Sequence, residues 1–142
     1  MILITGGTGF IGSNFEDVIK LPRSVNLLNY SETLNGIREN TDIDSVIHTA
    51  GRIGGIMGNR AEKGRYFYEN TQININVLEA CRELEIRNVL SFSSSCAYPL
   101  AANLPYKEED FHNGFPHEDH YGYAFSKRML DIQARCYREQ YG

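Results

Sequence analysis

The chain has 142 residues, of which 42% are hydrophobic and 23% are charged, the balance of an ordinary globular domain. This length predicts one domain, over residues 1–142, with a core that needs neither disulfides nor a structural metal. The net charge is -4, and the 14 Lys and Arg residues form no cluster, so we expect no nucleic-acid partner. No apolar stretch is long enough to predict a membrane-spanning helix.

The cysteines and the first residues indicate where the protein works. Cys81, Cys96 and Cys136 are an odd number and lack the spacing of a metal site. Met1 leads directly into apolar residues, without the basic segment that opens a secretory signal. These features predict reduced thiols, no bound metal and a cytoplasmic location.

The chain begins with a predicted strand, a turn and a helix. Residues 1–5 are almost wholly apolar, as in a strand that is covered on both faces. Glycines punctuate residues 6–12, and residues 13–21 can form a helix that Pro22 must end. A second strand is expected over residues 24–30.

Two helices and a buried strand are predicted in the middle of the chain. A short helix is expected over residues 32–40, and residues 45–49 have the pattern of a buried strand. A glycine-rich loop follows over residues 51–58. From residue 66 to 84, apolar side chains recur at spacings of three and four, which predicts a long helix with one buried face: Ile73, Val77, Ala80 and Leu84.

The last predicted elements complete an α/β fold. Residues 89–92 form a strand that leads into a run of serines, and residues 99–120 form a loop. A final helix is expected over residues 121–141, with four side chains toward the core: Met129, Ile132, Cys136 and Tyr137. Strands that alternate with helices predict a doubly wound, Rossmann-type parallel sheet. Ligands of such sheets bind beyond the carboxyl ends of the strands.

The glycine-rich turn is the first candidate site. Its sequence, Gly6-Gly7-Thr8-Gly9-Phe10-Ile11-Gly12, fits the pattern GxGxxG and lies between the first strand and the expected helix. A turn without Cβ atoms lets backbone N–H groups and the positive end of a helix approach a pyrophosphate closely. The pattern after an apolar strand therefore predicts binding of a dinucleotide cofactor.

Tyr123 and Lys127 are candidate catalytic residues. Their spacing of four places both side chains on one face of the final helix. A phenol has a pKa of about 10, and a neighbouring ammonium can stabilise its charged form. The same ammonium could also donate hydrogen bonds to a ribose.

The strand end at residues 93–96 adds hydroxyls and a thiol at the ligand-binding edge of the sheet. Ser94 could hold a substrate carbonyl or hydroxyl toward Tyr123. Ser93 and Ser95 are equally well explained as caps of a turn, and a lone Cys96 is more often a small buried apolar residue.

In combination, these residues resemble the extended short-chain dehydrogenase/reductase family, the NAD-dependent epimerases and dehydratases of nucleotide sugars. The resemblance lies in the glycine turn, Ser94 and the Tyr123/Lys127 pair, with 29 residues from Ser94 to Tyr123. Two further stretches, residues 54–59 and 94–99, resemble the GDP-L-fucose synthase branch, which converts GDP-4-keto-6-deoxymannose by 3,5-epimerisation and 4-reduction. Only the amino-terminal part of such an enzyme is covered.

The resemblance implies a role for each candidate residue. The turn, including Thr8, Phe10 and Ile11, would bind NADP(H), with NAD(H) also possible; three further residues would line the cofactor: Ala50, Gly51 and Ser93. Tyr123 would protonate the C4 oxygen, assisted by Lys127, and Ser94 would bind the same oxygen. Cys96 would move protons at C3 and C5. The partners implied are a GDP-linked sugar and a second copy of the chain, bound through helices near residues 66–84 and 121–141.

The sequence departs from the family pattern at one place and leaves other functions open. Only 13 residues separate Gly12 from Asn26, too few for a full helix, a turn and a complete strand. Another family enzyme, a UDP-sugar 4-epimerase or a GDP-mannose 4,6-dehydratase, is an alternative, although neither reaction calls for a thiol at Cys96. A non-catalytic cofactor-binding remnant is a third reading. We expect residues 1–142 alone to bind NADP(H) weakly and not to complete a catalytic cycle.

Overall fold

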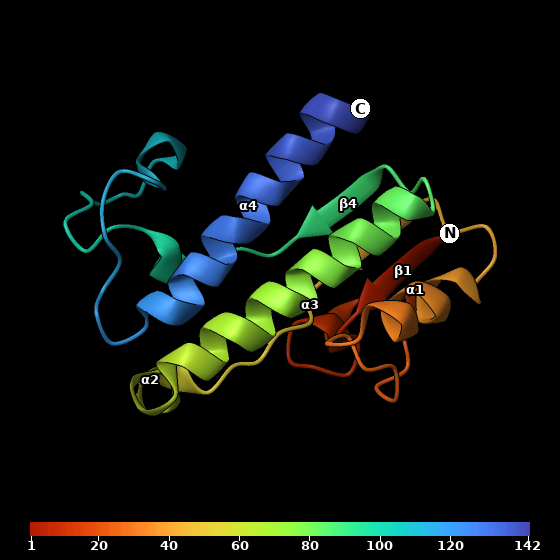
Figure 1. The fold of residues 1–142 in the computed structure, drawn as a ribbon, viewed down its shortest axis with the longest axis horizontal. Coiled ribbons are helices and arrows are strands. Elements are labelled where there is room, and N and C mark those ends of the chain that lie inside the picture. Colours follow the sequence, from red (N-terminus) through yellow and green to blue (C-terminus); the bar gives the residue numbers. More distant parts are fainter.

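The computed structural model describes residues 1–142 and contains a parallel sheet of four strands (Figure 1). The strands are β1 (Ile2–Thr5), β2 (Ile19–Lys20), β3 (Ser45–His48) and β4 (Asn88–Ser91), in the order β2-β1-β3-β4. Thr5 lies opposite His48, which in turn lies opposite Ser91, so three strands end level with one another. The predicted α/β class with a Rossmann-like sheet is confirmed.

The helices largely follow the sequence pattern. They are α1 (Tyr30–Arg38), α2 (Gly55–Ala61), α3 (Lys63–Glu83) and α4 (Tyr121–Tyr141). The helices expected near residues 32–40, 66–84 and 121–141 are therefore confirmed. The glycine-rich segment at residues 51–58 was expected to be a loop throughout, yet its second half forms the start of α2. None of the four helices has the length and apolar character needed to cross a bilayer.

The connection between β1 and β2 differs from the prediction. No α-helix forms over residues 13–21; the chain makes only one turn of 3-10 helix, η1 (Gly12–Asn14), before β2. A parallel crossover that contains a helix needs about a dozen residues or more, and here residues 6–12 form the glycine turn, which leaves only residues 13–18 before β2. The helix was therefore predicted wrongly because the chain is too short to form it and return to the sheet.

The strand predicted over residues 24–30 is also wrong. Two asparagines favour turns there: the Asn26 side chain accepts a hydrogen bond from the Leu28 amide at 3.1 Å. Asn29 caps α1 by accepting from the Glu32 amide at 3.1 Å. Asparagine competes with strand pairing by bonding to its own backbone neighbourhood, and this local preference decides the conformation here.

The core lies between one face of the sheet and the long helices. Leu3 and Val46 pack against Ile37 of α1 and Val77 of α3, and α4 lies beside α3 (Figure 1). On the opposite face, Leu90 is 56% exposed. Ile4, at the centre of the sheet, is fully buried, so this second face is covered there and exposed at the edge strand β4.

The face that α4 buries was predicted wrongly. Met129 and Ile132, which were expected in the core, are 40% and 44% exposed, and Cys136 is exposed as well. The helix instead buries Lys127 and Arg128 together with three smaller or apolar residues: Ala124, Ser126 and Leu130. A search for apolar periodicity overlooks this face because two of its members are cations.

Candidate functional site

The carboxyl ends of β1 and β3 bring the glycine turn and the loop after β3 into contact. Gly6 has a φ of +69°, and a Cβ atom there would lie 2.7 Å from the Ala50 nitrogen and 2.8 Å from its Cα. A Cβ on Gly51 would lie 2.9 Å from the Asn70 side chain. The turn and residues 50–51, which were predicted separately to bind the cofactor, therefore form one continuous surface.

The backbone of the glycine turn is tightly packed on its inner side, and on its outer side it leaves amides without a hydrogen-bond acceptor. Gly9 donates a backbone hydrogen bond to the Gly6 oxygen at 2.9 Å, and a Cβ on Gly12 would lie only 2.3 Å from that same oxygen. The amides of three exposed residues donate no hydrogen bond within the chain: Thr8, Phe10 and Ile11. Phe10 is 94% exposed. These free amides provide donors for an anion at the outer surface of the turn.

No α-helix follows the free amides of the glycine turn. The Ser13 hydroxyl and the side-chain amide of Asn14 both donate hydrogen bonds to the Phe10 carbonyl, at 3.2 and 2.6 Å, and so close the single turn of η1. The positive end of a helix, which the sequence predicted at this place, is therefore not part of the site. The backbone donors of the turn must provide the attraction for a pyrophosphate.

A substitution at Gly12 tests how tightly the turn is packed. Gly12→Ala should lower the free energy of unfolding by about 2 kcal/mol, because the backbone oxygen of Gly6 cannot turn away from a new methyl group. Gly64→Ala is the control: no atom lies within 4 Å of its Cβ position in α3, and alanine should raise the stability by up to about 1 kcal/mol. Urea unfolding of both variants gives the comparison; equal stabilities would contradict the packing.

Lys20 is a candidate that the sequence did not reveal. It ends β2, where Rossmann-type folds contact the adenosine ribose, and its stem lies over Gly7: a Cβ on Gly7 would be 2.7 Å from its Cγ. No acid occurs in residues 21–24, and Glu32 lies in α1, where it accepts a hydrogen bond from the Asn26 amide. Lys20 was missed because the second strand was predicted over residues 24–30.

Helix α4 carries the tyrosine and lysine pair to the carboxyl end of β4. Lys127 is only 6% exposed, and its ammonium donates to the Phe92 carbonyl at 2.8 Å. The ammonium lies 5.8 Å from the centre of the Tyr123 ring. Burial lowers the pKa of Lys127 to about 8. The lysine is thus fixed on the strand end, close to the phenol.

Tyr123 meets the serine and cysteine of the following turn. Burial raises the pKa of the Tyr123 phenol, the negative form of Cys96 raises that pKa further, and a hydrogen bond with Ser94 lowers it. Lys127 is not among the groups that shift the pKa. The proton therefore stays on Tyr123 at neutral pH, a state that suits a proton donor.

Ser94 is oriented by the turn that it begins. It caps η2 (Ser95–Ala97), where its Oγ accepts a hydrogen bond from the Cys96 amide at 3.2 Å. The hydroxyl proton is therefore free to point toward Tyr123. Cys96 is half-buried in the same turn, whereas Ser93 and Ser95 are exposed. Ser94, Cys96 and Tyr123 form a compact group.

His48 has a structural position beneath this group. Its Nε2 pairs with the Asn74 Oδ1 at 3.1 Å and its Nδ1 with the Thr5 hydroxyl at 2.7 Å, while the Asn74 Nδ2 donates to the Ser126 carbonyl at 3.0 Å. Since the Asn74 nitrogen bonds to Ser126, its oxygen must accept from His48, and Nε2 carries the ring proton. Thr5 then donates to Nδ1. Burial, together with Lys127, lowers the pKa of His48 to about 4.

The buried histidine predicts a particular loss of stability in acid. The unfolded chain binds a proton at pH values below about 6.5, whereas folded His48 does so only near pH 4; its contribution is present above 6.5 and is lost as the pH falls toward 4. This contribution amounts to roughly 3 kcal/mol. Urea unfolding from pH 7 to 4 should show a flatter pH dependence for His48→Gln than for the wild type and the control His117→Gln. Identical slopes would contradict the assignment.

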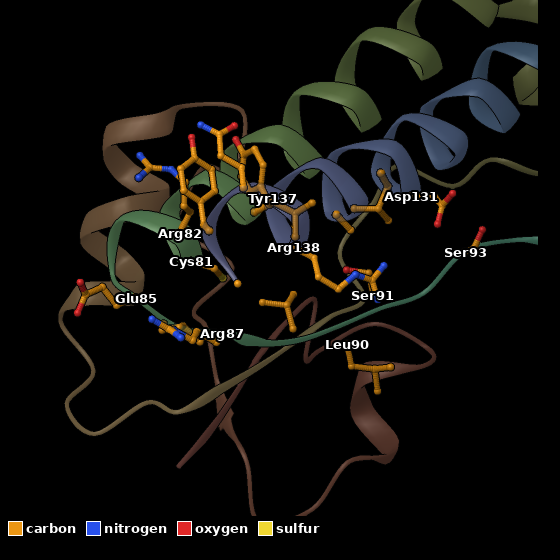
Figure 2. Close-up of a pocket in the computed structure, with 18 of the residues that line it drawn as sticks. Cys81, Arg82, Glu85, Arg87, Leu90, Ser91, Ser93, Asp131, Tyr137 and Arg138 are labelled. Atoms are coloured by element: carbon orange, nitrogen blue, oxygen red, sulfur yellow. The ribbon is translucent and has the colours of Figure 1, made fainter.

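A groove of about 880 Å³ lies beside the candidate site (Figure 2). It follows the edge of β4 that faces away from β3, between Leu90 and the second half of α4, with Tyr137 and Arg138 on its far wall. Of the predicted site residues, only Ser93 and Lys127 line it. The groove therefore reaches the site at one end but is not built around it.

Comparisons with known proteins agree with this geometry. The chain is 36% identical to GDP-L-fucose synthase of Dictyostelium discoideum over 99% of its own length and 48% of that protein. A solved structure of the GDP-L-fucose synthetase of Naegleria fowleri bound to NADP has a TM-score of 0.85, with 30% identity, over 98% of this chain and 45% of that one. The NADP-bound GDP-mannoheptose C4 reductase of Campylobacter jejuni has a TM-score of 0.89 and 26% identity, over 99% and 44% of the two chains.

The curated relatives are longer than this chain. The chain spans about half the length of the curated relatives that it matches. The profile of the NAD dependent epimerase/dehydratase family matches residues 2–142, nearly the whole sequence. The chain therefore belongs to the NAD dependent epimerase/dehydratase family.

Proposed function

We propose that this chain forms the cofactor-binding half of a nucleotide-sugar epimerase/reductase, which uses NADP(H) to convert a GDP-linked 4-keto-6-deoxy sugar. The observation that carries the proposal is the grouping of Ser94, Cys96 and Tyr123 beside the buried Lys127. The relatives named GDP-L-fucose synthase support the choice of substrate. The open amides of the glycine turn and the contact of Gly6 with Ala50 fit a dinucleotide.

The residues divide the reaction between a reduction and an epimerisation. NADPH, when bound, supplies the hydride for C4. Tyr123, which keeps its proton, donates it to the C4 oxygen, and Ser94 holds that oxygen by a hydrogen bond. Lys127 would bind the nicotinamide ribose. Cys96 exchanges protons with the carbons next to the ketone, since a thiol can both give and take a proton.

Cys96 is the feature that favours this function over its rivals. A UDP-sugar 4-epimerase or a GDP-mannose 4,6-dehydratase uses the tyrosine and lysine but needs no thiol there. A non-catalytic cofactor-binding remnant would need neither Cys96 nor Ser94. In this structure Ser94 forms a hydrogen bond with Tyr123, and Cys96 is close enough to raise the pKa of the phenol; an epimerising reductase would use both residues.

Tyr123 and Cys96 can be separated experimentally in a chimera. Residues 1–142 would replace the matching half of the Dictyostelium relative, and the product would be assayed with GDP-4-keto-6-deoxymannose and NADPH in D₂O. Tyr123→Phe should lower reduction at least about 100-fold through loss of the acid, while NADPH affinity stays nearly unchanged. Cys96→Ala should abolish deuterium incorporation at C3 and C5 but retain reduction at C4.

The control and the contrary results are well defined. Tyr121→Phe changes an exposed tyrosine two residues away on the same helix and should leave both activities intact. Full reduction by Tyr123→Phe would rule out its role as the acid. Unchanged deuterium incorporation in Cys96→Ala would make that thiol structural.

Lys20 is proposed to select NADP(H) over NAD(H). Its ammonium follows β2 with no acid in residues 21–24, so it can pair with the 2′-phosphate that distinguishes NADP. Lys20→Ala should weaken NADPH binding about tenfold, the effect of losing one charge-assisted hydrogen bond, and leave NADH binding unchanged. Fluorescence titration of residues 1–142 measures both, with the exposed Lys107→Ala as the control. An equal loss for both cofactors would contradict this role.

Two properties of the intact protein are proposed with the function: a cytoplasmic location and a homodimeric state. The three cysteines form no disulfide, as suits a reducing compartment.

Helices α3 and α4 lie side by side and expose apolar side chains, among them Ile75 and Ile132, which we propose pair with a second copy. Light scattering should show a dimer that Ile132→Asp dissociates, whereas the exposed loop variant Leu104→Asp should not. A monomeric wild type would refute the dimer.

A further inference from the structure

Arg128 connects two segments of irregular backbone to α4. It follows Lys127 and is only 5% exposed. Its Nε donates to the Ala97 carbonyl at 2.8 Å and its Nη1 to the Gly114 carbonyl at 2.7 Å. The guanidinium also stacks over the Phe125 ring, with 5.3 Å to the ring centre. One side chain therefore holds the η2 turn and the loop before α4 at the same time.

The guanidinium has no acidic partner that would explain its burial. Burial lowers the pKa of Arg128, and no carboxylate offsets this shift. Its Nη2 is buried without a hydrogen-bond partner. Burying a cation without a counter-ion is costly, and an apolar side chain of similar size could fill this space. What an apolar side chain cannot provide is the pair of directed hydrogen bonds to Ala97 and Gly114.

We propose that Arg128 is a positioning residue that fixes the Cys96 thiol beside Tyr123. The carbonyl that it grips belongs to Ala97, the next residue after Cys96, and Ala97 is fully buried. Tyr123 and Arg128 belong to the same helix, so α4 carries both the acid and the clamp for the thiol. The proposal rests on the proposed function, which gives Cys96 its chemical role.

Alkylation of the three cysteines in the 142-residue chain tests the clamp. Iodoacetamide labelling, followed by mass spectrometry over a range of pH, gives a rate for each thiol. The plateau of each profile at high pH reports access to the thiol, and its midpoint reports the local charge. Buried Cys81, which is 1% exposed, reports global unfolding, and exposed Cys136 reports the reactivity of the reagent.

Two variants separate geometry from charge. Arg128→Lys keeps the cation but cannot bridge both carbonyls, and Arg128→Met removes both hydrogen bonds and the charge. The plateau rate of Cys96 should rise about tenfold in Arg128→Met and by a smaller factor in Arg128→Lys, with Cys81 and Cys136 unchanged. Asn76→Ala is the control; it removes a buried hydrogen bond from α3 to the Leu27 carbonyl and should leave Cys96 unaffected.

The results that overturn the proposal differ from those that overturn the function. An unchanged Cys96 rate in Arg128→Met, or a parallel rise at Cys81, would show that Arg128 does not position the thiol specifically. In the chimera, Arg128→Lys should reduce deuterium incorporation at C3 and C5 more than reduction at C4. If alkylation changes but incorporation does not, the clamp stands and the catalytic role of Cys96 fails.

Discussion

A buried chain of hydrogen bonds from Thr5 through His48 and Asn74 to Ser126 connects the parts on which the site depends. It runs from β1 through β3 and α3 to α4, and the Ala50 amide joins it at the Thr5 hydroxyl. Every donor in it has one acceptor only if His48 is neutral with its proton on Nε2. The low pKa of His48 secures this state. The glycine turn and helix α4 are therefore held in one fixed relation.

Helix α4 is also held by two cationic side chains that donate hydrogen bonds to backbone carbonyls. Lys127 bonds to Phe92 just after β4, and Arg128 bonds to Ala97 in the turn that follows. Irregular backbone leaves carbonyls without partners, and long cationic side chains can reach them from a neighbouring helix. Ile132, in the second half of the same helix, is 44% exposed. The orientation of α4 thus follows from satisfying polar groups rather than from its apolar pattern.

This difference marks how far the sequence could predict the fold. β1, β3, β4 and α3 have dense apolar patterns, which is why their positions were predictable, and the glycine turn and the Tyr123/Lys127 pair were recognisable by spacing. The β1–β2 connection was not placed correctly: its length indicated a shortage of residues, but residues 13–21 are compatible with a helix, and the sequence did not show which element would be lost. Arg128 escaped notice because sequence patterns do not show which carbonyls a folded loop leaves unpaired.

The shortened crossover also changes how the site can attract a dinucleotide. In a standard mononucleotide-binding unit, the helix after the turn adds a partial positive charge to the amides. Here only η1 follows, so the attraction falls to the free amides of Thr8, Phe10 and Ile11. Lys20 adds a full charge at the neighbouring strand end, where its stem already lies against the turn at Gly7. A phosphate on the ribose would recover there part of the electrostatic energy that the missing helix does not provide, which is the physical basis of the proposed selection of NADP over NAD.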